Sequence, residues 1–311
     1  TLYHQGYEYG AAGNVEKFSR FNGELVDPVY DSLYQLRSLD YSTGSKTNES
    51  NFDFEYDKNG NRTSFKSDFS QREHTLEQNQ TTTIADSKLG DVSFEYDFRG
   101  NQIERTHKNA RGAALATETR TFNAANEMTG YSKILDRGFR KDTVTARYRY
   151  NPDGWRISKR INEGDPRYYL YQGNNVLCEK KSSLDDWTYH LYFGMRKLAD
   201  IKSDNSEEYY YTDHIGTVNM VADESGNITH RYVYGPFGNM EYNKGSSDNR
   251  YIYTGKEYDS ESGLWYIGAR YYDSRSGGWI GRDPQEEFYS AYCYVGNNPY
   301  GYFDPDGDET G

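Results

Sequence analysis

One short pattern returns along most of the chain: an aromatic residue followed by Asp or Asn, usually with Gly or Asn close behind it. Except for the last two, which are 14 residues apart, successive copies lie about 20 to 40 residues apart, a spacing typical of proteins that repeat one small structural unit. The copies are Tyr30-Asp31, Tyr56-Asp57, Tyr96-Asp97, Phe122-Asn123, Tyr150-Asn151, Tyr258-Asp259 and Tyr272-Asp273, with Tyr171, Tyr192, Tyr211 and Tyr234 between them. Such a chain is expected to join its units in sequence order.

Each unit has the pattern of a β-hairpin. FEYD at 54–57, and again at 94–97, alternates aromatic and polar residues as a half-buried strand does. Gly60-Asn61 follows and suits a turn with positive φ, and WRISKRI at 155–161 shows how a second strand leaves such a turn. Because a single hairpin is marginally stable, the hairpins are expected to pair edge to edge in one continuous all-β sheet. Barrel-like or spiral closure would reduce the exposed edges.

Composition supports this fold and disfavours some functions. The 311 residues include 33 Tyr and 30 Gly, and only 34% are hydrophobic, which favours strands and turns over Leu- and Ala-rich helices. The net charge of −12 disfavours nucleic-acid binding, which needs clustered Lys and Arg. The basic stretch at 140–160 alternates along apparent strands and is expected to be a solvated face. No run of 18 apolar residues occurs, so no membrane span is expected.

Three segments depart from the repeat. Residues 1–29 are weakly periodic, and the polar stretch 71–91 is expected to form an extended hairpin or a loop. After about residue 281, Asp283 suits a helix N-cap and Pro284 a first helical position. This predicts a short helix through EEFYSAYCYV at 286–295, ended by the Gly-Asn-Asn-Pro stretch at 296–299.

The cysteines and histidines point to no metal or cofactor. Cys178 and Cys293 could form a disulfide or remain two buried thiols, and the sequence leaves both open. His190 and His214 have no second ligand at a recognisable metal spacing, so a structural role is favoured for both.

The C-terminal third resembles the Rhs repeat-associated core. The stretches that carry the resemblance are YYYTDHIGTVNMVADESGNITHRYVYGPFGN at 209–239, YIYTGKEYDSESGLWYIGARYYDSRSGGWIGRDPQ at 251–285 and AYCYVGNNPYGYFDPDG at 291–307. The upstream units resemble YD repeats of the same family. The resemblance implies a YD-repeat shell over 30–207, a core domain over 208–307 whose part at 281–307 plugs a hollow shell, a weakly repetitive segment at 1–29 and a tail at 308–311.

The resemblance also implies a function. Members include bacterial polymorphic toxins, the C subunits of insecticidal toxin complexes and the teneurin adhesion receptors. The chain is therefore expected to be the encapsulating part of an exported toxin, secreted or at the cell surface. Its partners would be a toxin or other cargo polypeptide following in sequence, and a secretion component or a further shell segment. The alternative is an extracellular adhesion or scaffold module without cargo. Because 311 residues look too few to enclose a folded toxin, either a longer chain or an assembly of several copies is expected to complete the shell.

Finally, the resemblance implies self-cleavage by an aspartyl protease. Asp283 and Asp304 are the candidate carboxylates, Arg282 the candidate charge-stabilising group, and Pro305, Gly307 and Asp308 the cleavage motif, with the cut after Asp308. Two close carboxylates can share a proton, so that one activates water while the other donates. The first motif has Gln285-Glu286 without the usual Gly, and Asp308 stands where Leu is expected. Judged on residues alone, an Asp-Pro pair is more often a turn or a helix cap.

Overall fold

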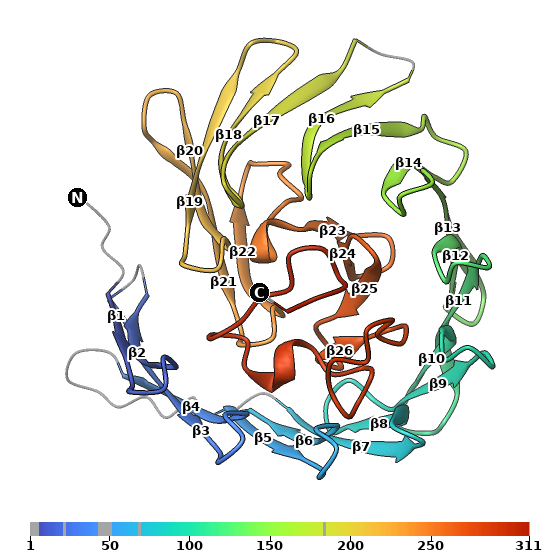
Figure 1. The fold of residues 1–311 in the computed structure, drawn as a ribbon. Helices are drawn as coiled ribbons and strands as arrows, with labels where there is room; N and C mark the ends of the chain where they lie inside the picture. The colour runs from blue at the N-terminus through green and yellow to red at the C-terminus, as the bar shows by residue number, and fades with distance from the viewer. Residues whose placement is uncertain (1–5, 21–22, 43–51, 68–69, 183–184, 311) are drawn as a thin grey trace.

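The computed structural model describes residues 6–20, 23–42, 52–67, 70–182 and 185–310. Twenty-two strands form one antiparallel sheet in which each strand pairs with the next along the chain. This sheet, called the wall, confirms the prediction of hairpins joined edge to edge, and it curves almost completely around an interior (Figure 1). Its strands are β1 (Tyr7–Tyr9), β2 (Val15–Ser19), β3 (Leu25–Tyr30), β4 (Leu36–Ser42), β5 (Phe52–Tyr56), β6 (Arg62–Lys66), β7 (Gln71–Glu77), β8 (Gln80–Asp86), β9 (Val92–Tyr96), β10 (Gln102–Lys108), β11 (Ala114–Phe122), β12 (Met128–Asp136), β13 (Lys141–Tyr150), β14 (Arg156–Ile161), β15 (Arg167–Gln172), β16 (Asn175–Lys181), β17 (Trp187–Phe193), β18 (Arg196–Lys202), β19 (Glu207–Thr212), β20 (Val218–Asp223), β21 (Ile228–Tyr234) and β22 (Met240–Gly245).

The repeated Asp or Asn builds the turn that follows each repeat strand. At the turn after β5, the carboxylate Oδ1 of Asp57 accepts the backbone N–H groups of Asn59 and Asn61, both at 2.9 Å. The Gly60 N–H donates to the Asp57 carbonyl at 3.0 Å, and Gly60 has a φ of 83°. A side chain that bonds its own backbone two residues on holds such a turn closed, and Gly adopts positive φ without strain.

The repeated Tyr ties its strand to the strand before it. The hydroxyl of Tyr56, at the end of β5, donates to the carbonyl of Leu36 at the start of β4, at 2.9 Å. The same bond joins Tyr30 to Val15, Tyr96 to Thr81, Tyr150 to Met128 and Tyr171 to Arg156, at 2.7 to 3.0 Å. In these five repeats a phenol therefore links two neighbouring strands, which explains why Tyr rather than Phe usually occupies this position.

A second, four-stranded sheet lies inside the wall. It belongs to residues 250–310, called the inner segment, and contains β23 (Glu257–Asp259), β24 (Leu264–Ile267), β25 (Arg270–Asp273) and β26 (Gly278–Trp279). Two single 3₁₀ turns, η1 (Tyr253–Gly255) and η2 (Val295–Asn297), are its only helical elements among the described residues. Its aromatic side chains pack closely, as where the Tyr272 and Tyr294 rings stack at 4.2 Å. Figure 1 shows the inner segment at the centre of the curve, with the C-terminus within it.

The predicted helix at 286–295 is wrong. The carboxylate of Asp283 does accept the N–H of Gln285, at 2.9 Å, but the chain then turns at Glu286, whose φ of 52° is incompatible with an α-helix. The Asp283 N–H instead donates to the carbonyl of Ala291 at 2.8 Å. Local cap signals were therefore overridden by contacts within the inner segment. The chain after Gly281 lies on the inner side of the wall (Figure 1).

Two further predictions from the sequence concern the stretches 71–91 and 140–160 of the wall. The polar stretch at 71–91 forms the predicted hairpin, β7 with β8. The basic stretch at 140–160 is not wholly a solvated face, because Arg156 and Lys159 are buried against the inner segment while Arg147 and Arg149 are exposed. No helix in the described part of the chain is long and apolar enough to cross a membrane.

Candidate functional site

Asp283 and Asp304 meet on one arginine, Arg270 of β25. Its Nη1 lies 3.2 Å from Oδ2 of Asp283, an ion pair without hydrogen-bond geometry, and its Nη2 donates to Oδ2 of Asp304 at 3.1 Å. All three side chains are buried. The structure thus brings together the two carboxylates predicted from the sequence, and places between them a cation that the sequence reasoning missed.

Arg270 also holds the main chain of the cleavage motif. Its Nε donates to the carbonyl of Gly307 at 2.5 Å, and its guanidinium carbon lies 4.1 Å from the centre of the Trp279 ring. A guanidinium presents its donors in a rigid fork, so one side chain fixes two carboxylates and one peptide group relative to each other. The segment at 304–307 is therefore anchored to β25.

The turn at Asp304 is closed in the same way as the turns of the wall. Its Oδ1 accepts the N–H groups of Asp306 at 3.1 Å and Gly307 at 2.6 Å. Gly307 has a φ of 80°, and a Cβ on it would lie 1.8 Å from the carbonyl oxygen of Ile267. Only glycine fits there. Close packing therefore explains why residue 307 is glycine, whether or not the chain is cleaved.

Burial changes the protonation of this cluster. It raises the pKa of Asp304 to about 6, against the opposing effects of the Arg270 cation and the N–H donors of Gly307 and Asp306. Burial also lowers the pKa of the nearby Lys256 to about 8, against the attraction of Asp304 and Asp306. Asp304 can therefore gain or lose a proton near neutral pH, which general acid–base chemistry requires.

The remaining predicted residues are dispersed. Arg282 is half exposed and donates to Glu286 at 2.8 Å, so its charge faces outward. Asp308 accepts from the side chain of Gln285 at 3.1 Å, and Pro305 is half-buried between Asp304 and Asp306. The charge-stabilising role expected of Arg282 is better served by Arg270. Arg270 stands in the repeat-like stretch RYYD at 270–273, which could have drawn attention to it. Its distance along the sequence from Asp283 and Asp304 gave no indication that it contacts both.

A second buried cluster joins the inner segment to the wall. Arg156 of β14 pairs with Glu257 at 2.7 Å and with Asp259 at 2.5 Å, and Lys159 pairs with the same carboxylates at 2.8 and 2.7 Å. Although burial opposes ionisation, Lys159 and Arg156 hold the pKa of Glu257 well below its usual range. The charges are thus mutually satisfied, and removing one would leave others buried and unpaired.

The histidines and cysteines take structural positions. His190 bonds Asp200 through Nδ1 at 2.7 Å, and the Nε2 of His214 lies 2.8 Å from the carbonyl oxygen of Tyr300. Cys178 and Cys293 are not bridged. Within the described ranges, no group of three or more His, Cys, Asp or Glu side chains is arranged to hold a metal ion.

Comparison with known families and proteins agrees with this architecture. The model of the Teneurin YD-shell family matches residues 3–300. The tRNA3(Ser)-specific nuclease WapA of Bacillus spizizenii is 31% identical over 71% of this chain, which spans 9% of that protein. The salivary gland surface protein 1 of Aedes aegypti is 29% identical over 96% of the chain and 9% of its own length. The toxin subunit YenC1 of Yersinia entomophaga is 24% identical over 97% of the chain and 36% of its own length.

The fold also occurs in a solved structure. The Photorhabdus luminescens Tc holotoxin pore matches with a TM-score of 0.51 and 19% identity, over 97% of this chain and 19% of that one. At this identity the likeness concerns the fold alone. This chain spans between 9% and 36% of the length of these proteins.

Proposed function

Because the chain belongs to the Teneurin YD-shell family, we propose that it is the end of a β-shell whose inner segment acts as a stopper that retains a polypeptide cargo. One observation carries this proposal: residues 250–310 lie inside the curve of the wall and are bound to it by buried ion pairs, as between Arg156 and Asp259. A segment held in this way blocks the interior and leaves only by breaking several charged contacts together. The cargo would be the polypeptide that follows in the longer protein.

The relatives support a toxin as the cargo. One is named a tRNA-specific nuclease and another a toxin subunit, and this chain spans 9% and 36% of them respectively. A shell that keeps such a domain from the producing cell, and is exported with it, fits both. The first experiment is to sequence the gene beyond Gly311. A variable domain beside a small immunity gene supports the toxin role, and a stop codon or an anchoring segment contradicts it.

An adhesion or scaffold role is the second candidate. The mosquito relative, a surface protein by name, is 29% identical over 96% of this chain, so a similar sequence occurs in a protein not named as a toxin. In that role the shell would be a rigid extracellular body. The same sequencing experiment separates the two roles, because an adhesion module needs no following cargo.

We further propose that the Asp283–Arg270–Asp304 cluster cleaves the chain after Asp308. Arg270 holds the Gly307 carbonyl and contacts both carboxylates, so one side chain joins the start of the cleavage motif to the two aspartates. One ionised aspartate takes a proton from water as the oxygen attacks the carbonyl carbon. The other, protonated, aspartate donates to the leaving amine, so that one peptide bond and one water become a carboxylate and an amine.

The test uses a precursor extended beyond residue 311. Asp283→Asn, Asp304→Asn and Arg270→Met should each leave the precursor intact by mass spectrometry, whereas wild type should release a fragment ending at Asp308. Glu309→Gln, an exposed change next to the proposed cut, is the matched control and should be processed normally. Processing of both aspartate variants at the wild-type rate would remove the pair from the mechanism without affecting the stopper proposal.

A further inference from the structure

Arg62, the first residue of β6, is a buried cation without a counter-ion. Its side chain is 8% exposed, and two of its nitrogens, Nε and Nη2, are buried without a hydrogen-bond partner. Its Nη1 makes one long bond, 3.3 Å, to the carbonyl of Ser276 in the inner segment. The Phe237 and Phe54 rings lie 3.9 and 5.0 Å from its guanidinium carbon. Aromatic faces stabilise such a cation only in part, and an unpaired buried charge is costly.

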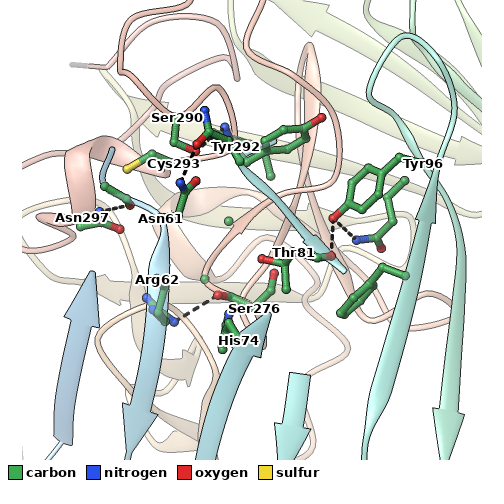
Figure 2. A pocket seen from close by; sticks show the side chains of 17 residues that line it. Asn61, Arg62, His74, Thr81, Tyr96, Ser276, Ser290, Tyr292, Cys293 and Asn297 are labelled. Carbon is green, nitrogen blue, oxygen red and sulfur yellow. Dashed lines mark hydrogen bonds between the residues drawn. The ribbon is translucent and has the colours of Figure 1, made fainter. Parts of the chain in front are cut away.

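Arg62 lines a small polar cavity between wall and inner segment (Figure 2). The cavity has a volume of about 40 Å³, and its lining includes Arg62, His74 and Asn79 from the wall and Ser276, Gly277 and Ser290 from the inner segment. A Cβ on Gly277 would lie 2.1 Å from Nη1 of Arg62, so only glycine lets the inner segment approach so closely.

His74 provides a second unsatisfied group at the same cavity. Both of its ring nitrogens are buried without a partner. Burial, with the charges of Arg62 and Arg72 adding to it, lowers the pKa of His74 to about 3, so the ring is neutral and presents one N–H donor and one acceptor. A buried imidazole with neither nitrogen bonded is rare in folded proteins, so His74 offers both nitrogens to a small ligand at the cavity.

The charges around the cavity leave a positive excess. Among the described residues that line it, Arg62 is the one Lys or Arg side chain, and none is Asp or Glu. In the described part of the chain, no carboxylate forms an ion pair with Arg62. The thiol of Cys293, on the cavity wall, cannot serve as an anion because burial raises its pKa to about 12. The Tyr56 phenol near Arg62 is neutral as well, since burial raises its pKa.

We propose that this cavity binds a single halide ion, chloride under physiological conditions, which neutralises Arg62 and ties the inner segment to the wall. The size of the cavity suits a small ion. A water molecule needs roughly 10–15 Å³ of such space, so the cavity holds a halide with one water. Water alone would fill the space and leave the guanidinium without a counter-ion.

The direct test is diffraction from crystals of the protein soaked in bromide, which scatters anomalously. The expected result is an anomalous peak within hydrogen-bonding distance of Nε or Nη2 of Arg62. Bromide peaks elsewhere on the surface with none in this cavity would overturn the proposal. This measurement needs only the wild-type protein, so it stands even if every Arg62 variant fails to fold.

The solution test compares thermal unfolding in chloride and in gluconate at equal ionic strength. Chloride should raise the Tm of the wild type by at least about 2 °C and leave that of Arg62→Met unchanged. Arg111→Met, at an exposed turn between β10 and β11, is the matched control and should respond as the wild type does. An equal chloride response in Arg62→Met would contradict a specific site.

Discussion

Arg156 of the wall and Asp259 of the inner segment form an ion pair in which neither side chain is exposed to solvent. They are 103 positions apart in the sequence, so the pair forms only when the inner segment has entered the wall. Buried ion pairs are weak evidence for net stability, but breaking one is strongly destabilising. The pair therefore fixes the position of the inner segment relative to the wall more than it adds net stability.

Arg156→Met should lower the free energy of unfolding by about 3–5 kcal/mol. The change leaves Glu257 and Asp259 buried with Lys159 as their remaining wall cation. Chemical denaturation followed by tryptophan fluorescence measures the loss. Arg147→Met, on the exposed face of β13, is the control and should change stability by less than about 0.5 kcal/mol. Equal effects of the two substitutions would mean that the buried pair does not hold the inner segment.

Tyr56→Phe should cost about 0.5–1.5 kcal/mol, the usual net contribution of one hydrogen bond. The substitution keeps the ring and removes only the donor to the Leu36 carbonyl. Tyr168→Phe, on a half-exposed ring in β15, provides the comparison and should be nearly neutral. If both lose the same stability, the phenol bond is not what keeps the repeat register.

Gly307→Ala should destabilise the docked C-terminal segment by about 1–3 kcal/mol. The new methyl group would meet the Ile267 carbonyl, and the positive φ adds strain. Hydrogen exchange at residues 304–310 should rise in the variant. Gly112→Ala is a close control, because Gly112 has a φ of 78° but open space around it, so it reports the backbone strain alone. A larger loss at Gly112 would argue against the close packing at Gly307.

The Asp304 carboxyl should titrate near pH 6 in carbon-13 NMR of labelled aspartate. Arg270→Met should move its pKa upward, because the cation stabilises the ionised form. Arg282→Met, whose charge pairs with Glu286 instead, should leave it unchanged. A titration near 4 in the wild type would show that Asp304 is solvated.

The raised pKa also sets a pH dependence of stability. The folded protein holds the Asp304 proton more tightly than the unfolded chain, whose pKa is about 3.9. The stability that this group contributes is complete below about pH 4 and is lost as the pH rises through 6. Asp304→Asn should remove that part of the pH profile, and an unchanged profile would contradict the assignment.

The sequence predicts the wall well because its information is local. The alternation in FEYD, and the turns in which Gly follows Asp three residues later, each depend on a few adjacent residues. Strands and hairpins can therefore be predicted from the local sequence alone. Alternation gives two faces of a strand but does not say which one faces inward. For this reason the burial of Arg156 and Lys159 was missed.

The site is less predictable for the same reason. Asp283 and Asp304 were found from their Asp-Pro motifs, but Arg270 was not, because its role depends on three segments meeting in space. The helix predicted after Asp283 failed because Arg270 and Ala291 hold the local chain in another conformation. Arg62 carries no sequence signal at all, since what sets it apart is that no carboxylate in the described part of the chain forms an ion pair with it.

The central claim is that the inner segment seals the wall around a following polypeptide. Limited proteolysis of the full-length protein tests it most directly, with the region after residue 311 followed by mass spectrometry. The region after residue 311 should resist the protease while the wall is intact. It should be digested once Arg156→Met or denaturant frees the inner segment. Digestion of the region in the intact protein, as fast as when it is produced alone, would contradict the account.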